Sequence, residues 1–202
     1  MGVKEKLKKM PSYSEELGLN LSVAEDRFKW FLASMLFAKR ISADIAKRTF
    51  RRFVEENLTT PDKILNAGWD RLVEVLDSGG YVRYDFSTAT NILETVKLLK
   101  SKYKGNLERL HEEASDSRDL EKRLMEFKGF GPTAVNIFLR ELRGIWPKAQ
   151  PKPSPIAIKV ANRLDLEDVE ELEPSLVRLY LEYCKKHKCE RCPVKTHCKE
   201  TS

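Results

Sequence analysis

The 202-residue chain has no long apolar run. Its mean hydropathy is −0.49 and 34% of its residues are charged. Because a helix that crosses a bilayer needs about 20 consecutive apolar residues, we expect neither a membrane-spanning helix nor a membrane partner. The basic start of the chain is not followed by an apolar segment, so we expect no secretory signal. The sequence therefore predicts a soluble cytoplasmic protein, associated with the nucleoid in a prokaryote.

Cysteine is absent until the end of the chain, where four residues follow the spacing C-x4-C-x2-C-x5-C: Cys184, Cys189, Cys192 and Cys198. A disulfide framework would spread its cysteines along the sequence, and disulfides are rare in reducing compartments. Four clustered thiols therefore indicate a metal site, and their compact spacing favours a 4Fe-4S cluster. Structural zinc is the alternative, with His187 and His197 as substitute ligands, although zinc sites more often use two C-x2-C pairs held apart by a longer spacer.

Signals for β-structure are also missing. Alternating β-branched runs and Asn-Gly or Asp-Gly hairpin turns do not occur, whereas apolar residues recur with helical spacing almost throughout. One such stripe consists of Phe28, Phe31, Leu32, Met35 and Leu36. We predict an all-α protein of roughly ten helices joined by short loops.

Several local patterns predict where helices begin and end. Ser22 and Glu25 have the spacing of a capping box, and Thr60 before a proline predicts an N-cap with proline in the first turn. Gly105 and Gly144 predict stops between helical segments.

The balance of charge and two loops favour a polyanionic partner. The formal net charge is +6 with a pI near 9.1, which is a weak signal because many solvated surfaces are basic. The segment 78–85 places a glycine pair before two tyrosines and an arginine, and the segment 146–155 contains four prolines and two lysines. Both segments are candidate ligand surfaces, and an ordinary interhelical loop is the alternative for each.

The segment 127–134 predicts a hairpin between two amphipathic helices. It reads Phe-Lys-Gly-Phe-Gly-Pro-Thr-Ala. Gly129 and Gly131 let backbone N–H groups approach an anion, and Pro132 suits the first position of a helix whose positive end faces the same point. A phosphate bound there would position the protein on DNA without reading its sequence. A plain turn between helices is the alternative.

The order of these motifs resembles the endonuclease III branch of the helix-hairpin-helix DNA glycosylases. The resemblance covers about residues 20 to 200 and is carried by the hairpin, the Pro-rich loop, the segment 159–164 and the cysteine loop at the expected distance downstream. It implies two domains: a six-helix barrel-type domain at 25–132 that ends in the hairpin, and a helical domain formed by 1–24 and 133–202 that carries the cluster.

The resemblance also implies an activity in base excision repair. Members of the family bind double-stranded DNA across the cleft between their domains, flip a damaged base out of the duplex and hydrolyse its N-glycosidic bond. A monomeric DNA glycosylase is therefore expected.

The chain departs from the family at both catalytic positions. Ser154 stands where the family has an aspartate, and Thr133 stands where bifunctional members have a lysine. A neutral hydroxyl stabilises the developing sugar cation poorly, and a hydroxyl cannot form the Schiff base needed for strand cleavage. We therefore expect an atypical, monofunctional active site without lyase activity. Lys152, Lys148 and Lys39 are the other amines considered for that role.

Two carboxylates are candidates for the missing catalytic acid. Asp85 lies in the loop that resembles the family's base-displacing region, and Glu141 follows the hairpin. The alternatives are a helix cap for Asp85 and a solvated surface position for Glu141. The predicted DNA contacts are Lys39, Arg40, Tyr81, Arg83, Tyr84, Lys128, Gly129, Phe130, Gly131, Thr133, Lys152 and Ser154.

Two rival functions remain at this point. One is a catalytically inactive relative that binds DNA or senses lesions, and the other is a zinc-bearing nucleic-acid adaptor. The damaged base is not specified by the sequence.

Overall fold

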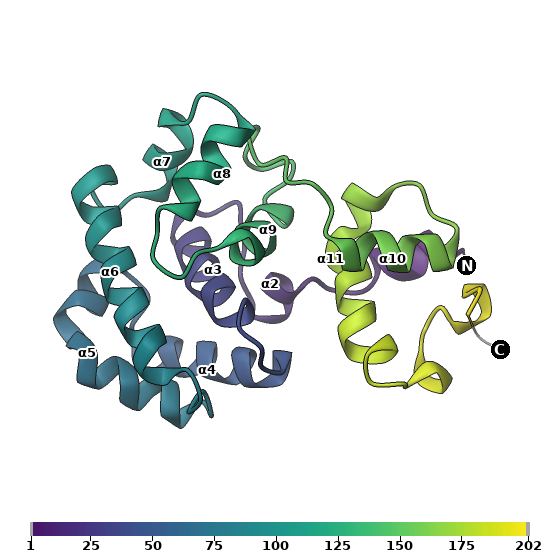
Figure 1. Ribbon diagram of the computed structural model, residues 1–202, viewed down its shortest axis with the longest axis horizontal. Coiled ribbons are helices and arrows are strands. Elements are labelled where there is room, and N and C mark those ends of the chain that lie inside the picture. Colours follow the sequence, from purple (N-terminus) through teal and green to yellow (C-terminus); the bar gives the residue numbers. More distant parts are fainter. Residues whose placement is uncertain (1, 201–202) are drawn as a thin grey trace. The chain divides into compact units, whose positions relative to one another are not determined.

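The computed structural model describes residues 2–200, and within that range it contains eleven α-helices and no strand (Figure 1). This confirms the predicted all-α class. The helices are α1 (Val3–Lys8), α2 (Tyr13–Glu16), α3 (Ala24–Phe37), α4 (Ala43–Glu55), α5 (Pro61–Ser78), α6 (Asp85–Tyr103), α7 (Leu107–Glu113), α8 (Ser117–Met125), α9 (Pro132–Arg140), α10 (Pro155–Leu164) and α11 (Val169–Leu179). None of the helices between residues 2 and 200 is long and apolar enough to cross a membrane.

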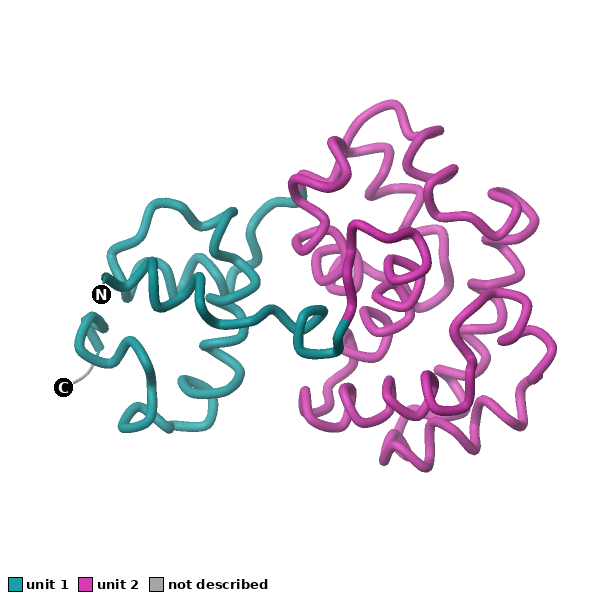
Figure 2. Tube along the Cα trace, turned by 180° about the vertical axis from the view of Figure 1, so that it is seen from behind, with its two compact units in different colours: residues 1–18, 151–202 teal, residues 19–150 magenta. Residues whose placement is uncertain are grey.

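The chain forms two compact units (Figure 2). The larger unit consists of residues 19–150, and the smaller consists of residues 1–18 and 151–202. The predicted division at 132/133 therefore differs from the observed one. Residues 133–150 belong to the larger unit because Phe138 and Trp146 are buried there, with ring centroids 5.6 Å apart.

An aromatic cluster holds the larger unit together. Helix α3 packs against α4, α7 and α9 (Figure 1). The ring of Phe31 stacks on Phe130 at 4.5 Å and meets Phe127 and Phe138 edge-on at 5.3 and 5.5 Å. Trp30 donates its indole N–H to the carbonyl of Phe138 at 3.3 Å. Burial of several large aromatic rings accounts for the docking of the hairpin helices on α3.

The predicted helix signals have mixed outcomes. Thr60 caps α5, since its hydroxyl accepts the Lys63 N–H at 3.3 Å. Helix α6 ends at Tyr103 just before Gly105, as predicted. The capping box at Ser22 is wrong, because Val23 is the N-cap of α3 and makes no side-chain cap. The Ser22 N–H instead donates to Asn20 Oδ1 at 3.1 Å, which makes residues 20–22 a local turn.

The smaller unit joins the two ends of the chain. Leu7 of α1 lies in one apolar core with residues of α10 and α11, and Ser175 donates its hydroxyl to the Leu7 carbonyl at 2.9 Å. Arg178 of α11 donates to the carbonyl of Pro11 at 2.6 Å and pairs with Glu16 at 2.7 Å. Residues 2–18 are therefore fixed to the C-terminal helices by both apolar and ionic contacts.

Candidate functional site

The segment between α8 and α9 is a tight turn. Gly129 has a φ of +78°, which favours glycine, and a Cβ added there would lie 2.5 Å from Nδ2 of Asn91. The Phe130 N–H donates to the Phe127 carbonyl at 3.0 Å, and the Lys128 carbonyl accepts the hydroxyl of Thr95 at 3.1 Å. The turn is thus held on α6, and its glycine is required by both conformation and space.

The outer face of this turn is open. Lys128, Gly129, Gly131, Pro132 and Thr133 are all exposed. Gly131 is the N-cap of α9 and provides no side-chain acceptor for the first-turn N–H groups, and a Cβ added to it would meet no atom within 4 Å. The uncapped N-terminal end of a helix carries partial positive charge. This arrangement can accept an anion such as a phosphate.

Two residues predicted to contact DNA have buried side chains. Phe130 is 1% exposed in the aromatic cluster, and Tyr81 is 1% exposed with its hydroxyl donating to the Leu36 carbonyl at 2.7 Å. Burial raises the pKa of the Tyr81 phenol well above its ordinary value. Both rings serve the core, so the Tyr81 ring does not stack on bases, and contact of DNA with the hairpin backbone at Phe130 stays a prediction.

The glycine pair after α5 is not a flexible hinge. A Cβ on Gly79 would lie 2.5 Å from the Cα of Thr49, so α5 approaches α4 at a distance that only glycine allows. Arg48 donates to the Gly79 carbonyl at 2.8 Å and covers Gly80. The first residues of the following loop are therefore held in place by contacts with α4.

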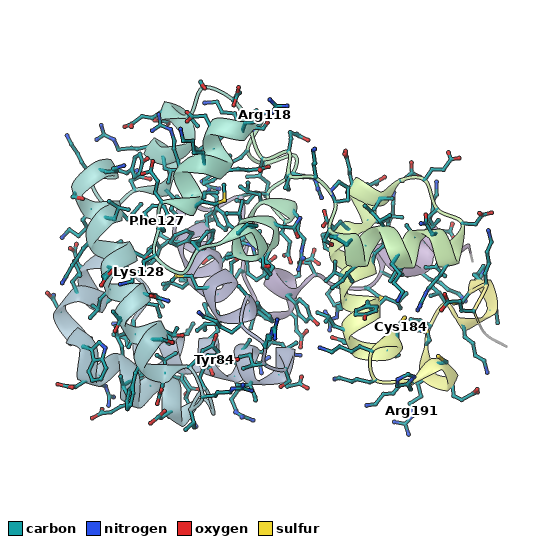
Figure 3. All side chains as sticks on the ribbon, in the orientation of Figure 1. Tyr84, Arg118, Phe127, Lys128, Cys184 and Arg191 are labelled. Carbon is teal, nitrogen blue, oxygen red and sulfur yellow. The ribbon has the colours of Figure 1, made fainter. Side chains whose placement is uncertain are left out.

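Three predicted residues meet at this loop. The ammonium group of Lys39 lies 5.9 Å from the ring centroid of Tyr84, and the guanidinium group of Arg83 lies 5.5 Å from the same ring. Tyr84 is half-buried and is the N-cap of α6 (Figure 3). Arg40 is exposed next to Lys39. The ring thus holds two cations near one another at the surface, which suits contact with a polyanion.

Asp85 lies beside this cluster but is buried, with 8% of its surface exposed. Its Oδ1 accepts the Phe86 N–H at 2.7 Å, and its carboxyl group is hydrogen bonded to that of Asp77. This hydrogen bond, together with partial desolvation and the nearby charge of Asp85, raises the pKa of Asp77. The structure thus places Asp85 in a carboxyl pair and not as an isolated exposed acid.

Glu141 and Lys148 lie away from the hairpin turn. Glu141 is half-buried at the far end of α9, eight residues or about 12 Å along the helix from Thr133. Its role as the catalytic acid stays a prediction. Lys148 donates to the carbonyls of His111 and Glu112 at 2.8 and 3.0 Å, so its ammonium group closes the C-terminal end of α7 and is not a free amine.

Ser154 caps α10, as predicted. Its hydroxyl accepts the Ala157 N–H at 3.3 Å, and its own backbone N–H donates to Oε1 of Glu173 at 2.8 Å. Glu173 lies on α11 and is fully buried. Sequence reasoning missed it, because the contact spans 19 positions and the sequence shows only another glutamate on an acidic helix. Lys152, two residues before the cap, is exposed.

The cysteine segment follows a change in helical geometry. Helix α11 passes into a π-helical turn, η1 (Tyr180–Cys184), in which the Lys185 N–H donates to the Tyr180 carbonyl at 2.8 Å. Such π-turns are frequent at functional sites. Two 3-10 turns follow, η2 (Cys189–Arg191) and η3 (Lys195–His197).

The loop is anchored on the core of the smaller unit. Val194 is fully buried, and Cys192 and Cys198 pack against the same apolar cluster. Cys184, Cys192 and Cys198 are half-buried, whereas Cys189 is exposed.

The thiols influence one another electrostatically. Burial raises the pKa of Cys184 and of Cys192, and the neighbouring thiols raise both further. Arg163 opposes this effect at Cys184 through its charge and a hydrogen bond to the sulfur. Within residues 2–200, no three Cys, His, Asp or Glu side chains converge closely enough to hold a metal ion. The donor set suits a soft metal centre, and free thiols need not converge before a metal binds.

Basic residues surround this loop, and some of them are already paired. Lys195 lies 2.7 Å from Glu190, and Lys199 lies 2.6 Å from Asp165. Lys185, Lys188 and Arg191 are exposed, and Figure 3 shows Arg191 on the loop beyond Cys184. The loop thus adds positive charge at the surface of the smaller unit.

No protein-family model matches the chain, and no curated protein is a detectable relative of it.

Proposed function

We propose that this protein has the helix-hairpin-helix DNA glycosylase fold, binds duplex DNA and excises a damaged base by hydrolysis of the N-glycosidic bond. The observation that carries the proposal is the open N-terminal end of α9 behind the Gly129 turn, where exposed backbone groups and Lys128 can receive a phosphate. Lys128 pairs with Glu94 at 2.8 Å across a largely exposed bridge, which is weak enough to yield to a phosphate.

The cluster on Tyr84 supports the same proposal. Lys39 and Arg83 are held on one ring in the larger unit, and Arg40 adds a third exposed cation next to them. Contacts of this kind bind the DNA backbone without reading its sequence, which suits a protein that searches for damage. The proposed binding is therefore independent of base sequence and weakens steeply with salt.

The chemistry proposed is monofunctional. Thr133 provides no amine at the start of α9, and Lys148 is held by two carbonyl groups. Base release by water needs a carboxylate or an equivalent charge near the sugar, because positive charge develops on the sugar ring as the glycosidic bond breaks.

A catalytically inactive lesion sensor is the second candidate. It is favoured by one observation, namely that Asp85 and Glu141, the acids proposed from the sequence, are half-buried or buried and engaged in the larger unit. A sensor would bind damaged duplex more tightly than intact duplex and release no base.

We further propose that Cys184, Cys189, Cys192 and Cys198 hold a 4Fe-4S cluster, which would give the loop its shape. Protein purified anaerobically should then be brown and contain about four iron and four sulfide ions per chain. Zinc without iron after anaerobic reconstitution would support the zinc-bearing adaptor instead. Changing Cys198 to serine should remove the colour, whereas changing the exposed His197 to glutamine should not.

The deciding experiment for the proposed function is a panel of duplex oligonucleotides, each with a different damaged base. Each duplex is incubated with the protein and then treated with alkali, which cleaves the strand at abasic sites. Cleavage of at least one damaged duplex supports a glycosylase. Preferential binding without cleavage supports the sensor, and equal affinity for damaged and intact duplexes without any cleavage would contradict both.

A further inference from the structure

An open groove lies on the smaller unit, formed by α10, the start of α11 and the residues that join the two helices. Its volume is about 580 Å³, and its lining combines apolar and acidic side chains: Pro153, Ile158, Glu167, Asp168, Val169, Glu170 and Glu171. A neighbouring hollow of about 440 Å³ is lined in part by the same Glu167 and Asp168. The two hollows therefore adjoin, and we call the first of them the acidic groove.

Ile158 gives the acidic groove an apolar side chain that the core does not use. The residue is 44% exposed, and it is the only large hydrophobic residue exposed among residues 2–18 and 151–200. Ala157 and Val160 of the same helix are buried in the core. Single exposed apolar residues are common on protein surfaces. Ile158, however, lies in a hollow together with Val169, so a partner's side chain can pack against both.

The charge of this surface is opposite to that of the chain as a whole. Residues 165–173 include six carboxylates and neither Lys nor Arg, although the formal net charge of the chain is +6. Five of these acids are exposed: Asp165, Glu167, Asp168, Glu170 and Glu171. Such a surface repels the phosphates of nucleic acids and attracts cationic groups.

Two lysines of α1 show which groups this surface accepts. The ammonium group of Lys4 pairs with Asp168, and that of Lys8 lies 2.7 Å from Glu171. The hydrogen bond to Asp168 raises the pKa of Lys4 and so favours its charged form. Both pairs are largely exposed, and exposed pairs are weak enough to exchange one cation for another. The carboxylates can therefore receive ammonium groups from a segment that docks beside them.

We propose that the acidic groove is a docking site for a basic, amphipathic segment of a partner protein. An apolar side chain of that segment packs on Ile158 and Val169, and its Lys or Arg side chains pair with Glu167 and Glu170. Charge complementarity selects this occupant, because the rest of the chain is basic and repels a cationic segment that the groove attracts. The inference goes beyond the proposed function and does not depend on it.

The test selects binders from a random library of short peptides displayed on phage. The full-length protein is immobilised without DNA, and the enriched peptides are then synthesised. Their dissociation constants are measured by fluorescence anisotropy at low and at high salt. We expect the enriched peptides to combine Lys or Arg with large apolar residues. Their affinity should fall as the salt concentration rises, because salt screens exposed ion pairs.

Two variants separate the apolar and the ionic contributions. Ile158→Ser removes the apolar contact and should weaken peptide binding about tenfold to hundredfold. Met125→Ser is its control, because Met125 is 45% exposed but lies in the larger unit. The double variant Glu167→Gln with Glu170→Gln should weaken binding about threefold to tenfold and reduce its salt dependence.

The control for the ionic contribution is the double variant Glu112→Gln with Glu113→Gln. Both acids are exposed in the larger unit, so this variant changes the net charge by the same amount without altering the groove. Its affinity for the peptides should equal that of the wild type.

The proposal is overturned if no peptide is enriched, if the enriched peptides are acidic, or if they bind Ile158→Ser as tightly as the wild type. Self-association of the wild-type chain that Ile158→Ser abolishes in analytical ultracentrifugation would also overturn it, because the occupant would then be a second copy. If circular dichroism shows that Ile158→Ser is unfolded, Glu167→Lys is measured instead, and undiminished peptide binding again overturns the proposal. No DNA is present in these measurements, so their failure leaves the proposed function in place.

Discussion

Gly129 and Gly131 lie two residues apart in the hairpin turn, and alanine at these positions should have opposite consequences. At Gly129, a non-glycine residue would have to adopt a φ of +78°, which costs about 1–2 kcal/mol. Its Cβ would also lie 2.5 Å from Nδ2 and 3.1 Å from Cβ of Asn91, and such overpacking costs about 1–3 kcal/mol. Gly129→Ala should therefore destabilise the protein by roughly 2–5 kcal/mol and lower the Tm by roughly 5–20 °C.

At Gly131 the same change should leave stability within about 0.5 kcal/mol of the wild type. The φ of −80° suits any residue, and no atom lies within 4 Å of an added Cβ. The larger side chain of Gly131→Val would instead fill the space above the uncapped end of α9. If a phosphate binds there, one charge-assisted hydrogen bond worth about 1.5–3 kcal/mol is lost, which weakens duplex binding about tenfold to hundredfold.

Thermal unfolding followed by circular dichroism measures the first effect, and fluorescence anisotropy with an intact duplex over a range of salt concentrations measures the second. Because the lost contact is to uncharged backbone N–H groups, the affinity should fall by a similar factor at every salt concentration, with the salt slope nearly unchanged. If Gly131→Val folds normally and binds the duplex like the wild type at every salt concentration, the segment is only a turn. An unchanged Tm in Gly129→Ala would refute the strain and packing argument.

Three further predictions concern other parts of the chain. Arg178→Ala should destabilise the smaller unit by about 3–5 kcal/mol and expose residues 11–18 to limited proteolysis, because the Arg178 side chain is only 12% exposed and its removal leaves buried partners unpaired. Arg52→Ala, which removes an exposed ion pair, should change the Tm little. Burial, and after it the charge of Lys148, keeps the pKa of His111 below its ordinary value of 6.5. The unfolded state therefore takes up a proton first as the pH falls, and the free energy of unfolding should decrease below about pH 6.5. Unfolding curves at several pH values should show a smaller pH dependence in His111→Asn. Borohydride should trap no adduct between the wild-type protein and abasic DNA, because Thr133 cannot form an imine; a strong adduct that disappears in Lys152→Gln would contradict this.

Features that depend on near neighbours in the sequence could be predicted. Helical periodicity gave the all-α class, and Thr60 and Ser154 are N-caps because their hydroxyls reach N–H groups only three residues ahead. The turn at 127–134 could be predicted for the same reason, since the positive φ at its centre is a local property of Gly129.

Features set by tertiary packing could not be predicted. Phe130 and Tyr81 are among the predicted DNA contacts, but whether a ring points outward or into a core depends on helices distant in the sequence. Lys148 lies in a loop rich in proline and lysine, yet its ammonium group binds a backbone carbonyl at the C-terminal end of α7. Asp77 and Glu173 gain their partners only when separate helices pack together, so neither was a candidate before the fold was known.

The smaller unit is built from both ends of the chain, and this has a consequence for the order of folding. The hydrogen bond between Ser175 and Leu7 spans 168 positions, so α1 has no core to join until the last quarter of the chain has been synthesised. Residues 19–150 form their own compact unit and can fold as they leave the ribosome. Until α10 and α11 have been synthesised, the N-terminal segment has no apolar core to join, and the side chain of Leu7 stays exposed to solvent. A chain interrupted between residue 150 and α10 would thus carry a formed hairpin and an N-terminal segment whose apolar side chain has no partner, a state that chaperones and proteases can recognise.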